Sequence, residues 1–134
     1  MTKLEIAALY SGLLLLILVA LAVQVSRQRR AGNVSIGDGG VPALHRAIRA
    51  HGNAAEYIPA GLGGLLFLAL LDPVPLWAMH AIGAALTIGR MAHGVALSQS
   101  EAPSPGRVLG MALTWLALLA AASGLIYGAL AGVV

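Results

Sequence analysis

The chain has 134 residues, of which 59% are hydrophobic and 10% charged, and its mean hydropathy is +0.87. A soluble domain carries about 25% charged residues, so this composition predicts an integral membrane protein and excludes a sizeable soluble domain. The formal net charge is +3, but the arginines border apolar segments and form no basic face, so we expect no nucleic-acid partner.

The first predicted element is a transmembrane span over about residues 4–25. The run from Ile6 to Val23 has 18 residues and no charge, which is long enough for a transmembrane helix. A cleaved signal peptide is the rival interpretation of this segment. Its apolar core would be shorter and followed by a small-residue cleavage site, whereas Arg27, Arg29 and Arg30 follow here.

A second helix is predicted over residues 42–71, after a glycine-rich loop at 31–40. Pro42 suits the first helical position because its missing N–H would be unpaired there anyway. This helix would be about 45 Å long, against a hydrocarbon core of about 30 Å, so its first three turns should project from the membrane. Pro59 should bend it inside the bundle.

Two further spans complete the chain. The segment from Asp72 to Pro75 contains two prolines and predicts a tight turn before a third span at 75–97. Ser104 is the expected N-cap and Pro105 the expected first helical residue before a fourth span at 106–131. The fold class is therefore all-α integral membrane, a four-helix transmembrane bundle in one domain over residues 1–134.

Arginine placement predicts the topology. The first connection holds five arginines and Arg107 opens the fourth span on the same side, whereas Lys3 is alone on the opposite side. The positive-inside rule then places both termini outside and the arginine-rich connections in the cytoplasm.

A polar stripe marks the point where the second helix changes from polar to apolar. Arg49, Asn53 and Glu56 lie with His45 in one sector of roughly 80° on a helix, and Tyr57 follows. A carboxylate and a guanidinium at the edge of a hydrocarbon layer are costly unless they face protein or a ligand. A structural ion pair of Glu56 with Arg49 is the alternative to a binding role.

Two arginines of the later spans are further candidates. Arg90 lies about 21 Å along the third span, and it could face protein, pair with Glu56 or extend to the interface. His93, one turn on, could donate a hydrogen bond or be an ordinary interfacial histidine. Arg107 is either a topogenic charge or an arginine aimed at an anion, since a guanidinium near a thiol favours the thiolate.

Other chemistries find little support in the sequence. It has no cysteine, which excludes disulfides, thiolate nucleophiles and cysteine metal sites. His45 and His51 have too few companions for a ligand cluster, so we expect no metal. No Ser-His-Asp arrangement, phosphate-binding glycine loop or dinucleotide fingerprint is convincing.

Together these residues resemble the MAPEG family, the membrane-associated proteins of eicosanoid and glutathione metabolism. The segment RAHGNAAEYIP, from Arg49 to Pro59, is similar to the family's RxxxNxxEYxP signature. The segment GRMAH, from Gly89 to His93, is similar to its GRxxH stretch in the third span. The loop from Gly37 to Gly40 is similar to that of small bacterial members, and the likeness covers nearly the whole chain.

The resemblance implies a multi-pass protein of the bacterial inner membrane that forms a homotrimer. It also implies glutathione as a co-substrate, bound between neighbouring subunits on the cytoplasmic side. Glutathione has two carboxylates for arginines and an ammonium for Glu56. Arg107 matches the arginine thought to stabilise the thiolate, provided that the preceding loop has one extra residue. The residues carried over as glutathione-binding are Arg27 or Arg29, Arg49, Asn53, Glu56, Tyr57, Arg90 and His93.

The leading interpretation is a glutathione-dependent transferase or peroxidase acting on hydrophobic small molecules that partition into membrane lipid. A non-catalytic lipid-binding or scaffold protein of the same fold is the alternative. Leu97 keeps it open, because several eukaryotic members carry tyrosines at this end of the third helix. A small four-helix drug exporter ranks last, since it needs an acidic residue deep in the first span and Glu5 lies at its end.

Overall fold

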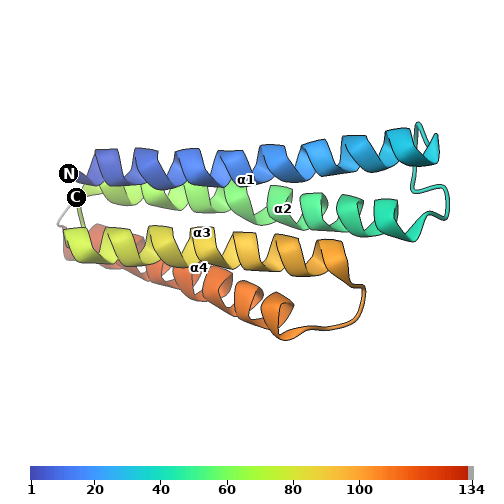
Figure 1. Cartoon of the computed structure of the whole chain (residues 1–134). Helices are drawn as coiled ribbons and strands as arrows, with labels where there is room; N and C mark the ends of the chain where they lie inside the picture. The colour runs from blue at the N-terminus through green and yellow to red at the C-terminus, as the bar shows by residue number, and fades with distance from the viewer. Residues whose placement is uncertain (133–134) are drawn as a thin grey trace.

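The computed structural model describes residues 1–132, which form four α-helices and no strand. The chain folds as antiparallel neighbours, and both termini lie at one end of the bundle (Figure 1). The predicted all-α, four-helix architecture is therefore confirmed. The helices are α1 (Lys3–Gly32), α2 (Pro42–Leu71), α3 (Leu76–Gln99) and α4 (Pro105–Ala131).

The helix ends follow local capping chemistry. In α1, the Thr2 side chain accepts from the Glu5 N–H and the Glu5 side chain accepts from the Thr2 N–H, which forms a capping box. This helix continues seven residues beyond the predicted span end at Val25, because the arginines near its C-terminus interact favourably with the helix dipole. Ser104 caps α4 as predicted, accepting from the Arg107 N–H at 3.4 Å.

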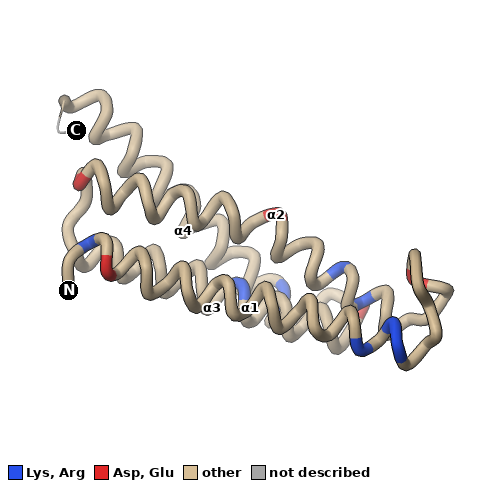
Figure 2. Tube along the Cα trace, turned by 90° about the horizontal axis from the view of Figure 1, so that it is seen from above, with Lys and Arg blue, Asp and Glu red and all other residues tan. Residues whose placement is uncertain are grey.

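Among the helices of residues 1–132, α1, α2 and α4 are long and apolar enough to cross a membrane. The 24-residue α3 is not one of them, because Arg90 and two histidines lower its mean hydropathy. Most Lys and Arg positions lie toward the end of the bundle away from the termini (Figure 2). The bundle thus has one arginine-rich end and one end with few cations.

The apolar core lies between α1, α2 and α3, and Ala117 and Ala121 of α4 also belong to it. Its fully buried side chains include Leu14, Ile58, Leu65 and Met79. α4 packs chiefly against α3, where Gly89 and Gly110 bring the two backbones together. A Cβ added at Gly110 would lie 2.6 Å from the backbone nitrogen of His93 and 2.7 Å from the backbone oxygen of Gly89. Only glycine therefore permits this close approach of the two helices.

Candidate functional site

A polar pocket lies between the first half of α2, the C-terminal end of α3 and the N-terminal end of α4. Figure 1 shows these parts of the helices at the end of the bundle away from the termini. Its volume is about 330 Å³. Three arginines and two histidines contribute to its wall, so it is suited to an anionic ligand. Its lining residues are His45, Arg46, Arg49, Asn53, His93, Leu97, Glu101, Arg107 and Met111.

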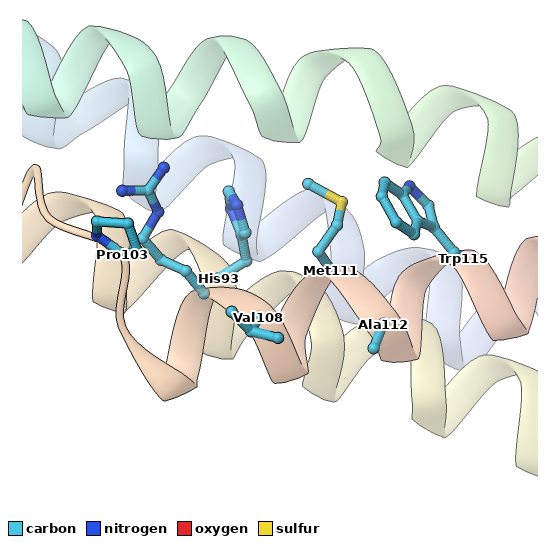
Figure 3. A pocket seen from close by; sticks show the side chains of 7 residues that line it. His93, Pro103, Val108, Met111, Ala112 and Trp115 are labelled. Carbon is cyan, nitrogen blue, oxygen red and sulfur yellow. The ribbon is translucent and has the colours of Figure 1, made fainter.

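A second, apolar pocket of about 380 Å³ adjoins it along α4 (Figure 3). The two pockets share His93, Arg107 and Met111. In Figure 3, the Met111 and Trp115 side chains extend from α4 toward α2. The lining residues of this apolar pocket are His93, Pro103, Arg107, Val108, Met111, Ala112 and Trp115.

Arg90 lies beneath the polar pocket and is only 1% exposed. Its Nε donates to the Thr114 hydroxyl at 2.8 Å, and its Nη1 donates to Oδ1 of Asn53 at 2.7 Å. The guanidinium also lies 5.0 Å from the centre of the Tyr57 ring, within cation–π range. Arg90 therefore joins α2, α3 and α4 through one buried group.

Thr114 is fixed in turn, because its hydroxyl donates to the Gly110 carbonyl at 2.8 Å. The close approach of α3 and α4 at Gly89 and Gly110 brings Thr114 within reach of Arg90. On the α2 side, the Trp115 indole Nε1 donates to the Tyr57 hydroxyl at 3.2 Å. A connected network thus runs from the floor of the polar pocket to the wall of the apolar pocket.

Arg107 borders both pockets. Its Nη1 donates to the backbone carbonyls of Glu101 and Ala102, at 2.7 and 3.2 Å. These contacts hold the guanidinium beside the α3–α4 loop and leave donors for a ligand, since an arginine has five N–H groups. Arg46 forms an ion pair with Glu101 at 3.6 Å. Within the described part of the chain, Glu101 is the only carboxylate in the wall of the polar pocket, and this ion pair neutralises its charge.

The stripe residues of α2 separate in the structure. Arg49 and Asn53 line the polar pocket, whereas Glu56 is exposed on the outer surface of the single chain. Across residues 1–132, Glu56 forms no ion pair with Arg49 or Arg90, so the ion-pair alternative is not realised. Tyr57 lies against Arg90 and does not line either pocket.

The two candidates on α1 lie elsewhere. Arg29 donates to the Gly37 carbonyl at 2.9 Å and so tethers the α1–α2 loop. Neither Arg27 nor Arg29 lines the polar or the apolar pocket of one chain. Of the nine residues predicted for the site, a single chain therefore brings Arg49, Asn53, His93 and Arg107 to the polar pocket, with Tyr57 and Arg90 directly behind it.

Sequence reasoning missed the α4 residues of this site. Met111, Thr114 and Trp115 follow Arg107 at i+4, i+7 and i+8, so they lie on one face of α4. That spacing is the signal that could have found them. Leu97, the expected departure from the family pattern, is 8% exposed and forms an apolar part of the polar pocket's wall.

These observations describe a helical membrane protein with an arginine-lined pocket at one end of its bundle. The model of the MAPEG family matches residues 7–127, and the chain belongs to this family. It is similar to the inner membrane protein YecN of two Escherichia coli strains, K12 and O6:H1. Each is 38% identical over 114 residues, which cover 85% of this chain and 85% of the relative.

Proposed function

We propose that this protein is a glutathione-dependent membrane transferase or peroxidase that acts on hydrophobic electrophiles. One observation carries the proposal: an arginine-lined polar pocket and an apolar pocket meet at Arg107, His93 and Met111. A polar thiol compound and an apolar electrophile bound in these pockets would come together beside a guanidinium. That is the arrangement required for thiol transfer.

The chemistry assigns Arg107 the catalytic role. Its guanidinium favours the thiolate of bound glutathione over the thiol, whose proton leaves to solvent. The thiolate then attacks the electrophilic carbon of an aryl halide, the carbon–sulfur bond forms and the halide leaves with the bonding electrons. Arg49 and Asn53 would hold the carboxylates of glutathione in the polar pocket.

We further propose a homotrimer in a bacterial inner membrane, with four spans and both termini outside. α3 would be about 36 Å long by the helical rise, which exceeds a hydrocarbon core of about 30 Å. Glu56 supports an oligomer, because an exposed carboxylate on an apolar helix is costly in lipid. A neighbouring subunit would cover it, and Arg27 or Arg29 of that neighbour would complete the glutathione site.

The test uses detergent-purified protein, with calorimetry for glutathione binding and absorbance for conjugation of a small aryl halide. Arg107→Gln should lower the turnover rate on the order of 100-fold, the usual cost of a lost charge-stabilising donor. Glu56→Ala should lose glutathione binding, because Glu56 would pair with the ammonium of the ligand where the neighbouring subunit covers it. Arg30→Gln is the matched control, since Arg30 is exposed on α1 and lines neither pocket. Wild-type protein that neither binds nor conjugates glutathione would overturn the proposal.

A non-catalytic lipid-binding protein is the second candidate. The apolar wall formed by Leu97 favours it, because a leucine offers no donor to glutathione. Copurified lipid in protein without glutathione affinity would establish this candidate in place of the first.

A further inference from the structure

We propose that Arg90 is a positioning residue that fixes the amide of Asn53 with its NH₂ group toward the polar pocket. Asn53 then acts as a donor to a ligand carboxylate and not as an acceptor for an ammonium. The identity of the ligand rests on the proposed function, whereas the amide orientation follows from the contacts of this chain alone.

The donor chemistry of arginine determines which end of the amide faces Arg90. A guanidinium has only donors, so the Asn53 atom 2.7 Å from Nη1 must be the carbonyl oxygen. The NH₂ group is therefore on the side away from Arg90. Because Asn53 is only partly buried and lines the polar pocket, that side opens into the pocket.

In this arrangement Arg90 acts on the ligand through Asn53 and not by direct contact. At 1% exposure it is enclosed by protein, and it does not line the polar pocket. Thr114 of α4 holds the guanidinium through Nε, and the Tyr57 ring covers it. An amide held this firmly has lost its freedom to rotate before the ligand arrives, which lowers the cost of binding.

The charge of Arg90 favours the same ligand group. Within residues 1–132, no carboxylate pairs with its guanidinium, whose partners are a hydroxyl, an amide oxygen, a thioether and a ring. A buried cation without a counter-charge favours an anion nearby, because charges interact strongly where water is excluded. We infer that the ligand carboxylate at Asn53 supplies this missing negative charge.

The Asn53→Asp variant tests the effect of the Asn53 amide on ligand binding separately from its effect on stability. The aspartate has the same shape and gives Arg90 a carboxylate partner, so the melting temperature in detergent should stay equal or rise. The pocket loses the NH₂ donors and gains a negative charge, so affinity for glutathione should fall by about tenfold or more. Asn33→Asp adds the same charge at the C-cap of α1, away from both pockets, and should leave binding unchanged.

Two probes distinguish this inference from the proposed function: glutathione, and glutarate, a dicarboxylate without thiol or ammonium. Glutathione binding that is equal in wild type and Asn53→Asp overturns the inference and leaves the function intact. Glutarate binding that is lost in Asn53→Asp, with no glutathione binding by wild type, supports the inference and overturns the function. Binding of neither probe by wild type overturns both.

Thr114→Val provides a second variant in case Asn53→Asp fails to fold. It removes the group that holds Arg90 from the α4 side while leaving Asn53 unchanged. The looser amide should discriminate less between glutathione and its diethyl ester, in which both carboxylates are blocked. Unaltered discrimination would show that Arg90 does not position Asn53.

Discussion

Tyr57 of α2 and Trp115 of α4 are joined by a hydrogen bond from the indole Nε1 to the phenolic oxygen, at 3.2 Å. Tyr57 also lies under the Arg90 guanidinium, and Trp115 lines the apolar pocket. The bond therefore connects the buried polar network with the pocket proposed for the electrophile. A substitution at Trp115 should therefore change binding in the apolar pocket more than binding in the polar pocket.

Trp115→Phe should raise the KM for an aryl halide several-fold while the Kd for glutathione stays within about twofold. The phenylalanine keeps apolar contact but loses the N–H that orients the ring. Steady-state kinetics and calorimetry measure the two constants separately. Trp77→Phe is the control, because Trp77 is 73% exposed at the start of α3 and lines neither pocket. If Trp115→Phe also lost glutathione affinity, the two pockets would not bind the electrophile and glutathione separately.

Thr114→Val should destabilise the protein by about 1–3 kcal/mol, because it leaves the buried Arg90 Nε without its acceptor. Thr87→Val is the matched substitution on α3. The Thr87 hydroxyl is buried and, in residues 1–132, has no hydrogen-bond partner, so its removal should be neutral or stabilising. Thermal unfolding in detergent compares the two variants. Equal losses would mean that the Arg90–Thr114 bond contributes nothing specific.

Gly110→Ala should destabilise the bundle by about 1–3 kcal/mol, the usual cost of overpacking. The added methyl group would press on the backbones of Gly89 and His93, which cannot move aside as a side chain can. Gly63→Ala, where a Cβ meets nothing within 4 Å, should instead stabilise α2 by about 0.5–1 kcal/mol. Thermal unfolding measures both variants. A lower melting temperature for Gly110→Ala and a higher one for Gly63→Ala would confirm that the backbones of α3 and α4 are in contact.

Asp38 should make the α1–α2 loop sensitive to acid. The Asp38 carboxylate accepts a hydrogen bond from the Gly40 N–H at 3.0 Å and contacts the His45 ring nitrogen Nδ1 at 2.7 Å. These contacts hold the pKa of Asp38 below its ordinary 3.8. A carboxyl whose pKa is lowered in the folded state stabilises the fold fully at pH values above its ordinary pKa. This stabilisation is lost as the pH falls through the lowered pKa.

The Gly40 amide resonance, followed by NMR, should therefore shift with a midpoint below pH 3.8. Asp38→Asn should abolish the transition. A midpoint at or above the ordinary value would show that the loop contacts do not favour the carboxylate.

The number of helices and most of their bounds could be predicted from the sequence alone. A polar, proline- or glycine-rich connection separates each apolar segment from the next, and Pro42, Ser104 and Pro105 begin helices for local reasons. The polar stripe of the second helix also followed from residue spacing, and its resemblance to the family signature came from the residue types along it. The end of α1 at Gly32 did not, because hydropathy marks the expected span and not the helix that continues beyond it.

Which polar groups meet depends on how the helices pack, and it could not be predicted from the sequence. The sequence offered Glu56 as a partner for Arg90, but the guanidinium binds Asn53, one turn earlier on α2, and Thr114 on α4. Helical periodicity gives the direction of a side chain around its own axis and says nothing of how two helices are rotated and shifted against each other. Close packing at Gly89 and Gly110 brings Thr114 to Arg90, whereas Glu56 on α2 stays exposed.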